Sequence, residues 1–163
     1  MNKVGNTRKV RKTSVSGFKL HKLLAVALVA GGSGVAVVSA NAPNSCPVDG
    51  CKVTIKSVVA SGSELEVSLE ANYTPDNAKN HLHSWWGEQY TSQQVGRNAK
   101  SEHGVEQGKW HRHDEYPTYL TSGAASTEIR DGATTLCITA ADRDHNVIDA
   151  DEYHCLDVST YLN

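Results

Sequence analysis

The sequence is poor in the residues that mark fibrous and low-complexity chains. Only 13 glycines and 4 prolines occur among 163 residues, while 39% of the residues are hydrophobic and 21% are charged. This composition excludes a collagen-like repeat, a coiled coil, a low-complexity disordered chain and a multi-pass membrane protein. It is the composition of an ordinary globular protein.

Acidic residues are absent from the beginning of the chain. All 18 Asp and Glu residues lie at or beyond Asp49, whereas seven of the 16 Lys and Arg residues precede position 23. The rest of the chain has nine basic and 18 acidic residues, a formal charge of −9. A nucleic acid or an anionic membrane surface requires a basic footprint on its partner. Neither is expected to bind the folded part of this protein.

The sequence has no apolar run of the roughly 20 residues that span a bilayer. Residues 1–22 are basic, residues 23–38 are apolar but interrupted by a Gly-Gly-Ser-Gly segment, and small residues up to Ala42 offer a cleavage site. This order predicts a secretory signal peptide over residues 1–42 and a mature domain over residues 43–163. In the alternative, an uncleaved anchor, this segment alone would contact the membrane. We expect a secreted or extracytoplasmic protein.

No Cys-x-x-Cys pair occurs, which disfavours a thiolate metal site. All four cysteines lie in the predicted mature domain: Cys46, Cys51, Cys137 and Cys155. An even number of cysteines in an exported domain indicates disulfides, and three pairings are possible. We favour Cys46 with Cys51, which closes a tight loop, and Cys137 with Cys155, for a reason that comes from the strands.

Alternation of apolar and polar residues predicts short β-strands separated by turns. They are expected over residues 51–59, 64–73, 80–86, 109–114, 134–141 and 153–158, with a helical turn over 91–95 and an exposed loop over 97–108. Cys137 and Cys155 both point away from the apolar faces of the last two strands, and a cross-strand disulfide requires this shared parity. The pattern predicts one all-β domain, an antiparallel sandwich.

Residues 131–142 read Asp-Gly-Ala-Thr-Thr-Leu-Cys-Ile-Thr-Ala-Ala-Asp. This segment resembles the penultimate strand of bacterial immunoglobulin-like (Ig-like) domains, in which a D-G-T-x-T-L-x-V-x-A-x-D pattern is common. Residues 80–83 and 155–158 also resemble small exported bacterial proteins of unassigned role. The resemblance implies a single Ig-like antiparallel β-sandwich with disulfides, and it implies no activity.

Histidine is the residue type that carries chemistry here. Seven of the eight histidines lie in the predicted mature domain, and four form two His-x-His pairs, His81 with His83 and His111 with His113. On a strand, residues i and i+2 point the same way about 7 Å apart, so each pair can direct two imidazoles at one ion. If the two strands pair or face each other, four imidazoles can surround one metal.

We therefore expect an exported domain that binds a divalent transition metal through both pairs. His103, Asp114 and Glu115 are candidates to replace one ligand. Imidazole ligands favour Zn or Cu and disfavour Mg or Ca. In the alternative interpretation these histidines lie on a solvated surface. The pattern is equally compatible with structural, transport and catalytic uses, and no catalytic residue is assigned.

The His-x-His strand resembles that of copper/zinc superoxide dismutases, which are also sandwiches with a disulfide. The sequence departs from them because it lacks their Gly-rich G-D-x-G-N segment, so their activity is not implied. For nucleophilic catalysis the sequence offers no G-x-S-x-G motif.

A cluster of oxygen ligands superficially resembles a calcium loop: Asp142, Asp144, Asn146 and Asp149. It departs from the EF-hand pattern, because Val147 stands where glycine is needed and Tyr153 replaces the final glutamate. An acidic, solvated turn is the favoured interpretation.

Aromatic residues make up only 6% of the chain and gather in its middle. Adjacent strand residues face opposite ways, so one of Trp85 and Trp86 is expected in the core. Trp85, with Trp110, Tyr116 and Tyr119, could then form an exposed platform. The alternative function is therefore a non-enzymatic cell-surface module that binds a glycan or a protein through exposed aromatics.

Overall fold

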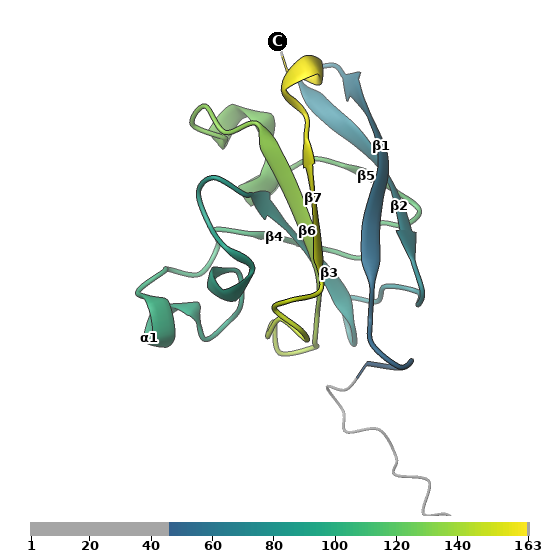
Figure 1. Ribbon diagram of the computed structural model, residues 1–163, viewed down its shortest axis with the longest axis vertical. Helices are drawn as coiled ribbons and strands as arrows, with labels where there is room; N and C mark the ends of the chain where they lie inside the picture. The colour runs from purple at the N-terminus through teal and green to yellow at the C-terminus, as the bar shows by residue number, and fades with distance from the viewer. Residues whose placement is uncertain (1–45, 163) are drawn as a thin grey trace, which may run out of the picture. The chain divides into compact units, whose positions relative to one another are not determined.

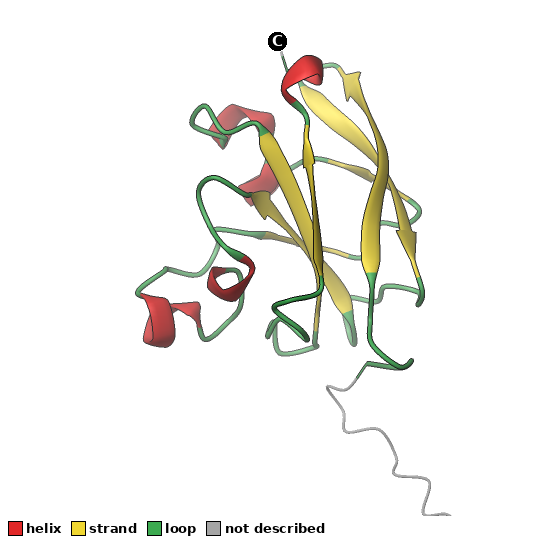
Figure 2. Ribbon diagram, viewed as in Figure 1, coloured by secondary structure: helices red, strands yellow, loops and turns green. Residues whose placement is uncertain are grey.

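Residues 46–162 fold into seven β-strands that form two antiparallel sheets (Figures 1 and 2). The computed structural model describes residues 46–162. The predicted signal peptide, residues 1–42, lies outside the described residues. Within residues 46–162, no helix is long and apolar enough to cross a membrane. The prediction of an all-β, sandwich-like domain is confirmed.

The first sheet has the strand order β1-β2-β5. β1, Val53–Ser61, and β2, Glu64–Ala71, form a hairpin through Gly62, whose φ of +65° is a left-handed conformation that glycine adopts without strain. β5, Thr118–Leu120, pairs with β2. The sequence pattern does not predict β5, because three residues are too short a run for alternation to appear.

The second sheet has the strand order β4-β3-β6-β7. β3, His81–Trp86, and β6, Thr135–Ala141, lie at its centre, and its edges are β4, His111–His113, and β7, Tyr153–Asp157. All four strands fall within ranges that the sequence pattern predicts. Every residue of β3 is buried. Both faces of this central strand must therefore be covered.

One face of the second sheet packs against the first sheet. Leu82 and Trp86 of β3 and Ile138 of β6 belong to the same apolar cluster as Leu65 and Val67 of β2. Each of these side chains is at most 1% exposed. Burying a side chain of this size contributes about 1.5–3 kcal/mol. This cluster is the core between the sheets, and it uses the apolar strand faces that alternation predicts.

The other face of the second sheet is covered by residues 87–110, which connect β3 to β4. This segment contains a 3-10 turn, η1, Ser92–Gln94, and a short helix, α1, Ala99–His103. Four buried residues form a second apolar cluster, which we call the outer cluster: Trp85, Val95, Trp110 and Cys137. Residues 87–110 are thus a cover that folds back over β3 and β6.

The helix α1 lies where the sequence predicts an exposed loop. Ala99 is fully buried, whereas the other four residues of α1 are exposed. The helix ends at Gly104, which has a φ of +71° and whose N–H donates to the carbonyls of Ala99 and Lys100. A helix with one buried residue has no apolar periodicity, so the sequence does not reveal it. By contrast, η1 lies within the predicted helical turn.

Both predicted disulfides are present. Their Cα atoms lie 5.6 Å apart in Cys46–Cys51 and 4.1 Å apart in Cys137–Cys155. Residues 46–162 contain no free cysteine. Cys137 and Cys155 lie directly opposite each other in the β6–β7 register, on the face that carries the outer cluster. The strand-parity argument for their pairing is confirmed.

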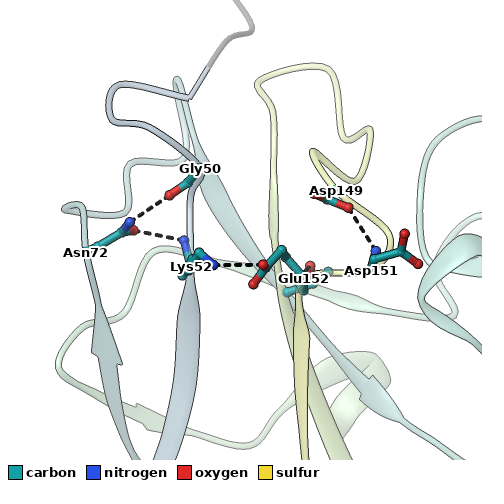
Figure 3. A network of polar contacts seen from close by, with 7 residues as sticks. Gly50, Lys52, Asn72, Asp149, Asp151 and Glu152 are labelled. Carbon is teal, nitrogen blue, oxygen red and sulfur yellow. Dashed lines mark hydrogen bonds and ion pairs between the residues drawn. The ribbon is translucent and has the colours of Figure 1, made fainter.

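A polar network ties the first disulfide loop to the end of the chain (Figure 3). The Asn72 side chain donates to the Gly50 carbonyl at 2.6 Å and accepts from the Lys52 N–H at 2.8 Å. The Lys52 ammonium in turn lies 2.8 Å from the carboxylate of Glu152, immediately before β7. Both partners of this ion pair are exposed, so solvent screens their attraction and the pair contributes little to stability. The network fixes position more than it adds stability.

The two disulfides are expected to contribute unequally to stability. The Cys137→Ala/Cys155→Ala variant should lose about 3 kcal/mol of unfolding free energy, because the bridge closes a loop with a sequence separation of 18. The Cys46→Ala/Cys51→Ala variant should lose only about 2 kcal/mol, since its separation is 5. Urea denaturation of the oxidised wild type and both variants measures the difference. A larger loss in the second variant would contradict this order.

Candidate metal centre

Two histidines of β3 point away from the core between the sheets. His81 and His83 alternate with the core residue Leu82, so their imidazoles lie on the outer face of the second sheet. Both side chains are 0% exposed. Their Nε2 atoms lie 3.1 Å apart. This is the convergence that the first His-x-His spacing predicts.

The third histidine of the site comes from the turn between β6 and β7. His145 is half-buried and has a φ of +67°, and its N–H donates to the carbonyl of Asp142 at 3.0 Å. The Asp142 carboxylate holds this turn by accepting from the N–H groups of Asp144 and Asn146 at 2.8 and 2.9 Å. The turn places Nδ1 of His145 3.0 Å from Nε2 of His81.

We call His81, His83 and His145 the three-histidine cluster. One ring nitrogen of each lies within 4.8 Å of those of the other two. A tetrahedral zinc ion with Zn–N bonds of 2.0–2.1 Å holds its nitrogen ligands about 3.3 Å apart. The two shortest distances in the cluster, 3.1 and 3.0 Å, are within a few tenths of an ångström of that value. Two of the three distances in the cluster thus suit a bound metal ion, and the third is at most 4.8 Å.

The residues after η1 contact the ring of His83 and the backbone of His145. The Val95 carbonyl lies 2.6 Å from Nδ1 of His83 and can only accept, so Nδ1 carries the proton and Nε2 presents its lone pair to the cluster. The N–H of Arg97 donates to the His145 carbonyl at 2.8 Å. A single segment of the cover thus contacts two histidines of the cluster that come from different parts of the chain.

Hydrogen bonds among neutral imidazoles fit this geometry poorly. Nε2 of His81 has two short contacts, to Nε2 of His83 and to Nδ1 of His145. An imidazole nitrogen carries either one proton or one lone pair, and His83 already presents a lone pair. His81 could satisfy both contacts only by sharing one proton between them. A cation at the centre would instead accept three lone pairs.

The surroundings keep all three imidazoles neutral. Burial lowers the pKa of His81 to about 4, aided by the charges of His145 and Arg112. Burial also holds the pKa of His83 well below its ordinary value. The pKa of His145 is lowered by burial and then by Arg112 and Arg97. Neutral imidazole is the form that binds a metal, so no proton has to leave the cluster near neutral pH.

The second His-x-His pair does not reach the cluster, which corrects the expected four-histidine site. β4 pairs with β3, but His113 lies opposite Leu82 and His111 lies opposite Ser84. Residues that lie directly opposite each other on neighbouring strands project from the same face of the sheet. His111 and His113 therefore lie on the core side, whereas the three-histidine cluster lies on the outer side.

His111 and His113 make structural contacts there. The ring of His113 stacks on Tyr119 with centroids 3.9 Å apart, and its Nε2 lies 2.9 Å from the Ser84 hydroxyl. Nε2 of His111 lies 3.2 Å from the Ser122 hydroxyl. Burial lowers the pKa of His113 to about 3 and shifts that of His111 in the same direction.

The three further metal candidates also lie outside the cluster. His103 is exposed on α1, with Nε2 3.9 Å from the carboxylate of the preceding glutamate. The Asp114 carboxylate accepts from the Asn77 N–H at 3.1 Å, and that of Glu115 accepts from the Leu120 N–H at 3.5 Å. Among the described residues, none of the three joins the group of converging donor atoms.

The acidic turn does not gather its oxygens around a cation. The Asp142 carboxylate accepts hydrogen bonds from Asp144 and Asn146 within the turn. The Asp149 carboxylate accepts from the Asp151 N–H at 2.9 Å (Figure 3). These oxygens satisfy the backbone of their own turns. The turn's contribution to the site is to position His145.

Three of the four aromatic residues expected on an exposed platform are buried. Trp85 and Tyr119 are 1% exposed and Trp110 is 8% exposed. Trp110 lies against the ring of His83, with centroids 5.3 Å apart. Only Tyr116, at 38%, is exposed. The cover buries Trp85 and Trp110, and Tyr119 lies in the core between the sheets, so these residues do not support glycan or protein binding through exposed aromatics.

His145 is the residue that sequence reasoning misses as a ligand. It is a single histidine in a polar turn, with no spacing motif to mark it. In the β3–β6 register, however, His81 lies opposite Ala141, the last residue of β6. Pairing the two predicted strands before assigning ligands would have placed the turn that follows Ala141 beside His81.

Comparison with known proteins assigns no family to the chain. No family model, no curated protein and no solved structure matches it. The functional interpretation therefore depends on the geometry of the three-histidine cluster.

As the pH falls, the metal-free domain is expected to lose stability at pH values well above those at which its carboxylates bind protons. In the fold, the pKa of His81 is about 4 and that of His113 is about 3, whereas both bind a proton near pH 6.5 when unfolded. Below that pH the unfolded state binds more protons, so stability falls as pH drops from 6.5 toward 4. The loss is about 1 kcal/mol per histidine between about pH 7.5 and 5.5.

Urea denaturation with a chelator present, repeated across this pH range, measures this dependence. His113→Gln should flatten it, because one buried titrating group is removed. His103→Gln, on the exposed face of α1, is the matched control and should leave it unchanged. A pH dependence that is the same in the wild type and His113→Gln would contradict the prediction.

Proposed function

We propose that the domain binds one divalent transition-metal ion, Zn or Cu, through Nε2 of His81, Nε2 of His83 and Nδ1 of His145. The observation that carries the proposal is the convergence of these ring nitrogens within 4.8 Å. The fixed proton on the far side of His83 supports it, because metal-binding histidines commonly donate their second N–H to a carbonyl. The lowered pKa values of the three rings support it further.

The ligand type favours Zn or Cu. Imidazole nitrogen suits both ions, whereas Ca and Mg are bound by oxygen ligands. The four cysteines are all disulfide-bonded, so no thiolate competes for a soft metal. The proposed property is metal binding itself, and no residue of the cluster is assigned a catalytic role.

We further propose that the chain is exported, with residues 1–42 as its signal peptide, and that its domain is Ig-like. Two disulfides fit an oxidising compartment. Sheets β1-β2-β5 and β4-β3-β6-β7 match the assignment of seven successive strands to A, B, E and to C′, C, F, G of Ig domains. The domain departs from antibody domains because its disulfide joins β6 to β7, the counterparts of F and G.

Elemental analysis of the domain tests the proposal. Protein purified from its exported form, without an affinity tag, is expected to hold about one Zn or Cu per chain. His145→Ala should lose this metal, with affinity reduced by more than the roughly 10- to 100-fold that loss of a supporting contact costs. His145 is the ligand to remove because it is half-buried, whereas His81 and His83 are fully buried.

Two control variants make the result specific. His103→Ala removes an exposed histidine and should retain the metal. His111→Ala removes a member of the second His-x-His pair and should also retain it. No uptake of Zn or Cu by the wild type at neutral pH, or loss of metal in His111→Ala but not in His145→Ala, would overturn the proposal.

Metal affinity is expected to be nearly constant from about pH 7.5 to 6. Three imidazoles with ordinary pKa values would lose roughly 50-fold in affinity over this range through competition with protons. In the fold, His81 and His83 are already neutral, and only His145 can still compete, which limits the loss to about fourfold. Competition with a zinc-sensitive dye at each pH measures this. A 50-fold decrease would contradict the prediction.

A further inference from the structure

The three-histidine cluster offers a metal ion no negative charge. Its ligands are neutral imidazoles, and no Asp, Glu or Cys of residues 46–162 joins the group of donor atoms. Asp142 and Asp114 are the acids whose charges reach His81, but Asp142 is engaged by its own turn and Asp114 accepts from the Asn77 N–H. A divalent ion here would have no negatively charged ligand, and the carboxylates of Asp142 and Asp114 would compensate its charge only from outside the coordination shell. An uncompensated buried charge is costly.

The cluster also leaves the ion incompletely coordinated. Zinc takes at least four ligands, and copper(II) takes four or more in tetragonal geometry. Three come from the protein, so at least one must come from solution. A ligand that also carries negative charge would satisfy both needs at once.

His145 is the most exposed histidine of the cluster. His81 and His83 are 0% exposed, whereas His145 is half-buried in a surface turn. Two exposed arginines stand at this point. One guanidinium nitrogen of Arg112 lies 3.5 Å from Nε2 of His145, and the N–H of Arg97 donates to the His145 carbonyl.

The charges of both arginines reach the imidazole of His145. Burial is the largest cause of the lowered pKa of His145. The two arginines lower this pKa further, whereas Asp142 and Asp144 raise it. The charge of Arg112 also lowers the pKa of His81. Arg112 projects from β4 opposite His83, on the outer face of the sheet. Arg112 therefore places a positive charge beside the most exposed histidine of the cluster, where it would attract anions.

We propose that a small anion with an oxygen or nitrogen donor atom completes the coordination of the metal ion, and that Arg112 attracts this anion. The inference rests on the proposed function. Hydroxide derived from metal-bound water belongs to this class of ligand, as do small carboxylates and azide. The anion supplies the fourth ligand and neutralises part of the buried charge.

Azide titration of the copper-loaded domain tests the inference. The protein is loaded with one equivalent of Cu(II), the stoichiometry is checked by elemental analysis, and azide binding is followed by the appearance of a new visible absorption band. We expect saturable binding of one azide. Arg112→Ala should weaken it about fivefold, the effect of one partly exposed charge, and Arg112→Lys should largely restore it. Lys56→Ala, which removes a charge on the first sheet, should leave it unchanged.

The outcomes separate this inference from the proposed function. Loss of copper binding in the wild type would overturn both. A domain that holds copper but shows no spectral response to azide would overturn the inference alone. Equal azide affinity in the wild type and Arg112→Ala, with equal copper content, would overturn the assignment of Arg112.

Discussion

The antiparallel pairing of β3 with β6 is the constraint on which the core and the site both depend. Its register sets His81 opposite Ala141, and the alternation of β3 then sends Leu82 and Trp86 into the core and His81 and His83 to the outer face. The same register brings the turn after β6 alongside His81. A slip of one residue would exchange the two faces of β3. It would place the imidazoles between the sheets and the core side chains under the cover.

Residues 87–110 bury the imidazoles on the outer face of the sheet, which therefore need polar partners there. Buried polar groups cost free energy unless they are paired, and the Val95 carbonyl pairs the far nitrogen of His83. The far nitrogen of His81 has no partner among the described residues. The ring of His81 is thus fully buried, but one of its two nitrogens has no hydrogen-bond partner among the described residues. Such local disagreement between packing and polar satisfaction is a feature of functional sites.

The sequence predicts what depends on one strand at a time. Alternation within residues 80–86 assigns His81 and His83 to one face, and the shared parity of Cys137 and Cys155 predicts their disulfide. Whether His83 faces His111 or Arg112, however, depends on the register of β4 on β3, which strand patterns leave open. The ligand role of His145 and the burial of Trp85 depend on how a turn and a cover pack against β3. Neither contact has a local signal in the sequence.

The three histidines of the cluster come from β3 and from the turn between β6 and β7, and the cover contacts both. Val95 holds His83 and Arg97 holds His145, so an ion bound by the cluster and a docked cover favour the same arrangement. The cover has its own apolar support in the outer cluster, which requires no ion. The free energy of binding is therefore available to hold the His145 turn and to align the rings. An ion that binds only the folded state stabilises that state. Metal binding by the cluster would therefore stabilise the turn that carries His145, which is the most exposed part of the site.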